Sequence, residues 1–338
     1  MIDTERPGAF YSEGVPGKDY SMAHYLVKRL LWFVPVILIT LTLLFFLLQV
    51  VPGDPLRAAF GDQQALSEEQ LQTLRTQLGL DKPLSVRYFK WLWDVMHLDL
   101  GISFYTGATV KEQIGARIPI TTGLVTLSVL IMIVLSVPCG VLAGFYHDKW
   151  PDWILRLFST LFISLPHFWI AVMAIMALLI LRGSALSIEY FNIFTQPYDA
   201  VKQLILPAFI MALRPFGVGT RMIRSALVEI LEEDFIRTAR AKGLTEALVT
   251  RRHALPNALV PVVTFYGLES IVLIGAAVVI ERIFGLPGIG SLVVQAAQSR
   301  DLYVLQGSIL VLLFFALVIN LFIDVLYASL DPRVKYEE

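Results

Sequence analysis

Long apolar runs without charge constrain the fold of this chain more than any other feature of its sequence. Four runs contain at least 22 consecutive residues without Asp, Glu, Lys or Arg: residues 30–51, 120–146, 157–181 and 302–323. Because the hydrocarbon core of a bilayer is about 30 Å thick, roughly 20 apolar helical residues are enough to cross it. Two weaker runs, residues 204–218 and 255–280, contain Arg214 and Glu269 respectively. We therefore predict an all-α integral membrane protein with six transmembrane helices.

The composition excludes several other classes of protein. Charged residues make up 16% of the chain, against about 25% in soluble domains, and a soluble fold could not bury the 56% that is hydrophobic. The single cysteine, Cys139, excludes an intramolecular disulfide and a multi-cysteine metal site. A net charge of −1 gives no general attraction to nucleic acid. The phosphate-binding signature G-x-x-x-x-G-K-[ST] is absent, so we expect this chain not to hydrolyse ATP itself.

Basic residues set the expected orientation of the helices, because short cytoplasmic loops are enriched in Lys and Arg. With the amino terminus in the cytoplasm, the two tails and the loops 147–156 and 219–253 hold 15 basic residues. The short outer loops 182–203 and 281–301 then hold four. We therefore expect both termini to face the cytoplasm.

These spans divide the chain into five predicted parts. Residues 1–29 form a cytoplasmic tail, 30–51 the first transmembrane helix and 52–118 an extracytoplasmic helical segment. Residues 119–330 form the core with five further transmembrane helices, and 331–338 form a cytoplasmic tail.

The extracytoplasmic segment contains helix signals of its own. Ser67 and Gln70 have the spacing of a capping box, and Gly79 is a plausible end for the helix that follows. A second apolar set, Tyr88, Leu92 and Val95, follows Pro83. We expect a helical cap packed on the outer mouth; a substrate-contacting surface is the alternative.

The polar stretch 229–257 is the most informative part of the sequence for function. Acidic residues come early and basic residues late, the polarity that a helix dipole favours. Ala239 and Gly243 are four residues apart, which would place them on one helix face, and Gly243 also permits a turn between two short helices. Apolar side chains suited to a partner's groove are Phe235, Ile236, Leu244 and Leu248. An amphipathic helix at the lipid headgroups is the alternative.

This stretch resembles the EAA loop of ABC-importer permeases, in which Glu-Ala-Ala is followed by three residues, Gly, nine residues and Ile-x-Leu-Pro. With Gly243 aligned, Ala239, Leu255 and Pro256 match, whereas Arg237, Thr238 and His253 depart from the pattern. Several other runs are similar to the peptide and nickel branch of that family: RTARAKGL at 237–244, RHALPNALVPVV at 252–263, VVPGDP at 50–55, LGLDKP at 78–83, FGLPGIG at 284–290 and DPR at 331–333.

The resemblance implies a type I importer permease that binds no cofactor. Its implied partners are a second, similar permease, two cytoplasmic ABC ATPase subunits that use Mg-ATP, and an external substrate-binding protein. The implied location is the cytoplasmic membrane of a bacterium or archaeon, and the implied cargo is a dipeptide or oligopeptide. The residues that would couple the permease to the ATPases are Arg237, Thr238, Ala239, Arg240, Ala241, Lys242, Gly243 and Leu244.

Two charges in the predicted spans need an explanation, because a charge at the centre of a membrane helix costs about 2.5–3.5 kcal/mol on insertion scales. Arg214 and Glu269 either form a structural pair, or contact the second permease, or line the translocation path. His167 follows a proline, and we expect it to be a packing residue rather than a metal ligand. Import of nickel or another small solute is an alternative function, and ion-coupled secondary transport is a weaker one.

Overall fold

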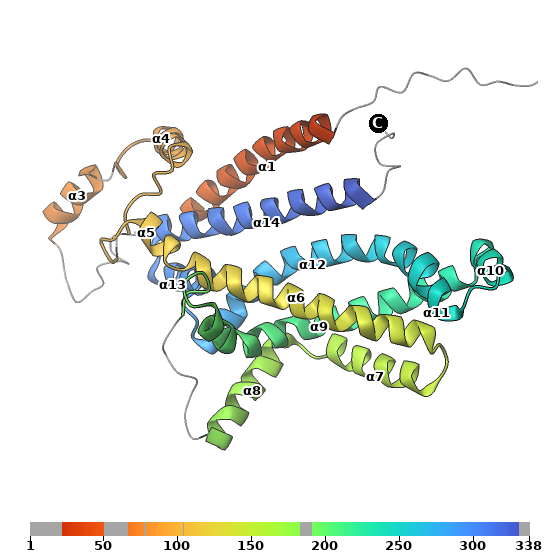
Figure 1. Cartoon of the computed structure of the whole chain (residues 1–338). Coiled ribbons are helices and arrows are strands. Elements are labelled where there is room, and N and C mark those ends of the chain that lie inside the picture. Colours follow the sequence, from red (N-terminus) through yellow and green to blue (C-terminus); the bar gives the residue numbers. More distant parts are fainter. Residues whose placement is uncertain (1–21, 51–66, 78, 104, 183–190, 331–338) are drawn as a thin grey trace, which may run out of the picture.

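The computed structural model describes residues 22–50, 67–77, 79–103, 105–182 and 191–330, and Figure 1 shows their arrangement. In these ranges the regular structure is helical, apart from one isolated antiparallel bridge between Ile102 and Thr109. The long helices are α1 (Met22–Val50), α6 (Ile118–Phe145), α9 (Pro197–Leu231), α12 (Leu255–Phe284) and α14 (Leu302–Leu330).

These five helices account for five of the six predicted spans. Each contains a stretch that is long and apolar enough to cross a membrane, and a bent helix pair makes a sixth candidate in the described ranges. Helix α1 begins eight residues before the predicted first span, but its apolar stretch is Arg29–Leu47. The prediction of an all-α membrane protein is confirmed.

The predicted third span is wrong as a single helix. Residues 157–181 are divided between α7 (Trp150–Ser164) and α8 (His167–Arg182), whose axes differ in direction by 94°. Leu165 is extended, with φ −91° and ψ 125°, and Pro166 follows it. Because proline lacks a backbone N–H and disfavours a helical conformation in the preceding residue, the chain bends at this point.

The core of the bundle lies where α6, α9 and α12 meet (Figure 1). Its largest cluster includes Leu124 from α6, Met211 from α9, and Leu273 and Ile280 from α12, all fully or nearly fully buried. Gly140 of α6 allows close approach to α9, because a Cβ atom added there would lie 2.6 Å from the Cβ of Ile223. Small residues serve the same purpose in other membrane helix pairs.

One end of the bundle carries α3 (Glu68–Gln77), α4 (Leu84–Met96), α5 (Val110–Gly115) and α13 (Ile289–Ser299) (Figure 1). The capping box is confirmed, since the Ser67 N–H donates to Gln70 Oε1 at 2.9 Å and the Gln70 N–H donates to Ser67 Oγ at 3.3 Å. Helix α4 packs against the end of α1, where the Tyr88 hydroxyl lies 2.7 Å from Thr42 Oγ1. We call this the outer end.

The opposite end carries α10 (Asp234–Ala241) and α11 (Glu246–Val249), together with the start of α1 and the end of α14 (Figure 1). Helices α1 and α14 lie side by side, and Arg29 Nε lies 2.5 Å from Asp324 Oδ2. This ion pair fixes the start of α1 next to the end of α14, so these two helix ends lie on the same side of the bundle. We call this the coupling end, after the role predicted for residues 237–244.

Candidate coupling segment and buried charge networks

The coupling segment, residues 232–254, links α9 to α12 through short helices. Helix α9 ends at Leu231, α10 follows as Asp234–Ala241, and Gly243 lies in the turn before α11 with φ +81°. Glycine adopts this left-handed conformation without the steric cost that a Cβ atom imposes. The prediction of two short helices separated by a turn at Gly243 is confirmed.

The prediction that Ala239 and Gly243 share one helix face is wrong. Helix α10 ends at Ala241, two residues before Gly243, because the chain turns there. Ala239 is buried within this chain, in a cluster that includes Leu227, Ile236 and Val249. Gly243 is exposed, and a Cβ atom added to it would meet no atom of this chain within 4 Å.

The four apolar side chains of the segment divide into two pairs. Ile236 is fully buried, and Leu244 packs against the same cluster. Phe235 is 45% exposed and Leu248 is 40% exposed. The exposed pair therefore offers apolar surface to a partner, whereas the buried pair holds the segment onto the end of α9.

Arg240 connects three elements, the end of α9, α10 and the start of α11, and thus acts as an internal brace. The sequence did not predict these contacts. Its guanidinium donates to both Glu246 carboxylate oxygens, at 2.7 and 3.1 Å, and to the Leu231 carbonyl at 3.2 Å. The end of α9, α10 and the start of α11 are thus fixed to one another. Arg237 pairs with Asp234 within α10, at 3.1 Å. Other exposed members of the predicted set are Thr238, Ala241 and Lys242.

A π-helical turn, η1 (Thr250–Ala254), joins α11 to α12 without a break. Such turns insert one extra residue into a helix and are frequent at functional sites. The helical backbone therefore runs from Glu246 to Phe284, and this 39-residue stretch is one of the span candidates. The coupling segment is therefore continuous with α12 at one end and with α9 at the other.

Arg214 and Glu269 face each other across α9 and α12. Arg214 Nη1 lies 3.7 Å from Glu269 Oε1, and the two side chains are 45% and 13% exposed. Both residues lie near the middle of their helices. The structure thus brings the two charges together, as expected for a pair, and leaves half of the arginine on the surface of the chain.

A second ion pair on α9 was not predicted. Arg224 donates to both oxygens of Asp152, from Nε at 2.5 Å and from Nη2 at 2.7 Å. The Asp148 N–H donates to the same carboxylate at 3.0 Å. Asp152 is fully buried, so this pair joins the start of α7 tightly to α9. The partners are 72 residues apart and the sequence between them gives no sign of the contact.

A buried glutamate organises the outer end and was also missed. Glu281 of α12 accepts hydrogen bonds from the Thr121 hydroxyl of α6 at 2.6 Å and from the Ser291 N–H of α13 at 2.9 Å. Thr121 in turn accepts from the Ile289 N–H at 2.8 Å. The carboxylate lies at the start of α13, where a helix favours negative charge. The run at 284–290 is therefore a tight turn wrapped around Glu281.

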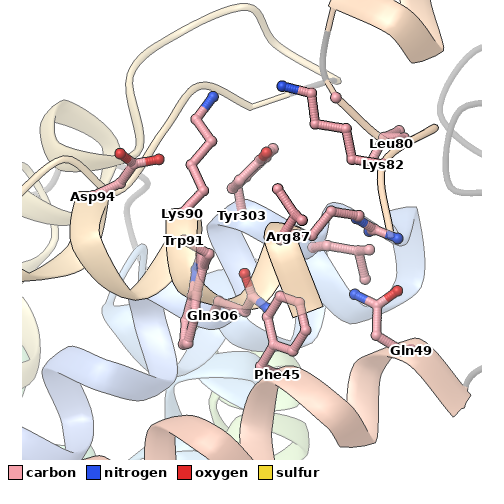
Figure 2. Close-up of a pocket in the computed structure, with 13 residues that line it drawn as sticks. Phe45, Gln49, Leu80, Lys82, Arg87, Lys90, Trp91, Asp94, Tyr303 and Gln306 are labelled. Carbon is pink, nitrogen blue, oxygen red and sulfur yellow. The ribbon is translucent and has the colours of Figure 1, made fainter. Parts of the chain in front are cut away.

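Figure 2 shows a pocket of about 80 Å³ at the outer end, between α1, α4 and the start of α14. The rings of Phe45 and Trp91 line it 5.3 Å apart, and the amino groups of Lys82 and Lys90 point away from them (Figure 2). Small-molecule pockets usually measure about 300–1,000 Å³. This pocket therefore lies where α4 meets α1 and α14, and it is too small for a peptide.

His167 is the first residue of α8, directly after the bend. Across the described ranges no group of three or more His, Cys, Asp or Glu side chains is placed to hold a metal ion. The packing role of His167 stays a prediction.

Two family models together match most of the sequence. Residues 136–336 match the binding-protein-dependent transport system inner membrane component, and residues 22–125 match the amino-terminal region of such membrane components. The chain belongs to this family. It is thus a permease subunit, which is not an enzyme, and the resemblance noted in the sequence is confirmed.

Relatives and solved structures agree with this assignment. A putative peptide transport system permease protein of Brucella abortus (strain 2308) is 41% identical over 94% of this chain and 100% of its own length. The glutathione transport system permease protein of Salmonella paratyphi A is 34% identical over the same shares. An inward-facing structure of the MetNI methionine ABC transporter matches with a TM-score of 0.50 and 19% identity, covering 64% of this permease and 96% of that chain. An amino acid ABC transporter matches with a TM-score of 0.51 and 14% identity, over 65% and 94%. The last two likenesses concern the fold.

Proposed function

We propose that this permease forms half of the membrane pathway of an ATP-driven importer of peptides. The names of its relatives, which refer to peptide and glutathione transport, support peptide cargo. The importer fold of the structural neighbours supports alternating access, in which packed helices move as rigid bodies between two arrangements. A second, similar permease would supply the other half of the pathway, and an external binding protein would deliver the cargo.

The coupling segment is the proposed receiver of motion from two cytoplasmic ABC ATPase subunits. The observation that carries this proposal is its construction: it is braced internally by Arg240, joined without a break to α12, and still exposes Phe235 and Leu248. Apolar side chains on a short helix are suited to a groove on a partner. Exposed Lys242 and Arg237 would add polar contacts, and the exposed turn at Gly243 would allow close approach of the partner. Mg-ATP would be bound and used by the ATPases.

The proposed location is the cytoplasmic membrane of a bacterium or archaeon, with the coupling end in the cytoplasm. The basic residues concentrated in the loops at that end support this orientation. The Arg29–Asp324 ion pair supports placing the start of α1 beside the end of α14, and both helix ends lie toward the end of the bundle that carries α10 and α11 (Figure 1).

For Arg214 and Glu269 we propose a structural pair between α9 and α12. Their separation of 3.7 Å supports this role. The exposed half of Arg214 would face either the second permease or the aqueous pathway, because exposing a charge to the lipid interior costs free energy.

The test is reconstitution of the complete complex, with its ATPases and binding protein, in proteoliposomes. We expect ATP-dependent accumulation of labelled di- and oligopeptides, and no accumulation of nickel. Accumulation of nickel alone would reject peptide cargo. Uptake that does not depend on ATP and is lost when an uncoupler dissipates the ion gradient would reject the ATP-driven mechanism.

Capture of the ATPases tests the coupling surface separately. Phe235→Ala should reduce co-purification of the ATPase subunits, because it removes exposed apolar surface from α10. Phe194→Ala is the matched control, since Phe194 is 70% exposed and lies before α9 at the outer end. Equal retention of the ATPases by both variants would contradict the proposed surface.

A further inference from the structure

A pocket lined by three arginines lies between α7 and α9, beside the coupling end. Its volume is about 220 Å³, against about 80 Å³ for the outer pocket. The residues that line it are Arg156, Thr160, Arg221, Arg224 and Ser225. The lining thus combines guanidinium donors with two hydroxyl groups and includes no carboxylate, although the Thr160 hydroxyl already donates to the Arg156 carbonyl at 2.8 Å. Such a set is suited to an anion that accepts several hydrogen bonds.

The charge of the pocket is only partly neutralised. The Asp152 carboxylate binds Arg224 in the two-bond contact described above and also interacts electrostatically with Arg156. Arg156 and Arg221 are exposed, and in the described part of the chain neither forms an ion pair with a carboxylate. The three arginines and Asp152 together therefore retain two positive charges.

The exposed tryptophans near Arg156 indicate that the pocket lies close to the depth of the lipid headgroups. Helix α7 begins at the coupling end, directly after α6 ends (Figure 1). Arg156 follows Trp150 by six residues, which is about 9 Å along a helix. Trp150 and Trp153 are exposed, and tryptophan is enriched where the membrane meets water. The Arg156 guanidinium lies 5.3 Å from the centre of a Trp153 ring, which favours its orientation.

Exposed apolar side chains lie beside the pocket on α7. Leu157, Phe158 and Leu161 are all exposed and follow Arg156 toward the bend. Residues three and four apart lie on the same side of a helix, so Leu157 and Leu161 extend one stripe. The cationic pocket therefore has apolar surface beside it on α7, because Leu157 and Leu161 each follow a pocket residue, Arg156 or Thr160, by one position.

We propose that this pocket binds the phosphodiester headgroup of an anionic phospholipid from the leaflet at the coupling end. Arginine binds phosphate oxygens through paired N–H groups, and basic pockets between transmembrane helices are suited to anionic headgroups. The acyl chains would cover the apolar stripe of α7. A free phosphate ion offers the same acceptor oxygens to the arginines, but it has no acyl chains to cover the apolar stripe. Bound lipid would brace the junction of α7 and α9 beside the Asp152–Arg224 pair.

Native mass spectrometry of the assembled transporter tests this assignment, with added phosphatidylglycerol or with phosphatidylcholine that carries the same acyl chains. We expect Arg156→Gln and Arg221→Gln each to reduce retained phosphatidylglycerol about fivefold, since a basic residue near an anionic surface contributes roughly that factor. The conservative variants Arg156→Lys and Arg221→Lys should retain an intermediate amount, because they keep the charge and lose the paired donors. Lys149→Gln is the matched control, because Lys149 precedes α7, is exposed and does not line the pocket.

Four results would overturn the proposal. Equal loss of phosphatidylglycerol in Lys149→Gln would indicate general surface charge, and equal retention of phosphatidylcholine by the unaltered transporter would remove the headgroup preference. Displacement of the lipid by millimolar inorganic phosphate would indicate a site for a free anion. Loss of the second permease from a complex with Arg156→Gln or Arg156→Lys would indicate that the pocket is a contact between subunits. None of these results bears on capture of the ATPases, so the proposed function is tested independently.

Discussion

The coupling end and the middle of the bundle hold α9 in different ways. At the coupling end, Arg224 binds buried Asp152 through two bonds of 2.5 and 2.7 Å. Ten residues earlier on the same helix, Arg214 and Glu269 lie 3.7 Å apart, with the arginine half exposed. The Asp152–Arg224 pair is a short ion pair with two hydrogen bonds, whereas Arg214 and Glu269 make a single long contact. The proposed function has α9 receive motion at one end and change its neighbours near its middle, and this difference between the two pairs is compatible with it.

Loss of the Asp152–Arg224 ion pair should have the largest effect on stability. Asp152→Ala leaves Arg224 mostly buried without its partner, and breaking a buried ion pair in this way costs about 3–5 kcal/mol. Thermal unfolding in detergent, followed by circular dichroism, measures the loss. The double variant Asp152→Ala/Arg224→Leu is the control and should recover part of the stability. If Asp152→Ala were as stable as the unaltered permease, the Asp152–Arg224 pair would not be what holds α7 to α9.

The packing of the coupling segment should have the next largest effect. Ile236→Ala removes a fully buried side chain from the cluster at the end of α9, which costs about 2–5 kcal/mol for such substitutions. Phe235→Ala, at the adjacent and exposed position, should leave the unfolding midpoint within about a degree. Equal destabilisation by the two substitutions would mean that the segment is not packed as described.

The internal brace of the segment should matter less for stability. Arg240→Ala removes the contacts to Glu246 and to the Leu231 carbonyl, but the side chain is 39% exposed, and ion pairs of this kind contribute about 0–1 kcal/mol. Hydrogen exchange should nevertheless become faster in α10 and α11, because the brace that connects them is lost. Lys242→Ala is the control. Unchanged exchange in Arg240→Ala would contradict a brace.

The mid-membrane pair should have the smallest effect on folding. We expect Arg214→Gln to reduce stability less than Asp152→Ala does, since the contact is longer, at 3.7 Å, and the arginine is 45% exposed. Assembly with the second permease and transport are measured separately on the same preparation. Lost assembly would place Arg214 at the subunit contact, and a cost as large as that of Asp152→Ala would remove the distinction between the two pairs.

The sequence predicted what depends on local pattern. The apolar runs predicted where α1, α6, α9, α12 and α14 lie, and Ser67 and Gln70 predicted a helix start that the structure confirms. The turn at Gly243 was predictable because glycine tolerates a left-handed conformation. The bend between α7 and α8 had a visible signal in Leu165-Pro166, but the apolar run across it outweighed that signal in the prediction.

Contacts between distant residues were not predictable in the same way. Thr121 and Glu281 are 160 residues apart, and their contact depends on how α6 and α12 pack. Glu281 lies at the edge of its apolar run, so it did not stand out as a charge inside a span. The Ala239–Gly243 prediction failed because it assumed one continuous helix, whereas the turn at Gly243 ends that helix first.

The most direct measurement compares ATP hydrolysis with uptake in proteoliposomes that contain the complete complex and either the unaltered permease or Gly243→Asp. The substitution adds a charged side chain at an exposed turn whose φ of +81° disfavours a Cβ atom, beside the proposed ATPase contact. We predict that the variant inserts in the membrane and that its ATP hydrolysis no longer produces peptide uptake. Uptake per ATP equal to that of the unaltered complex would contradict transmission of motion through the coupling segment.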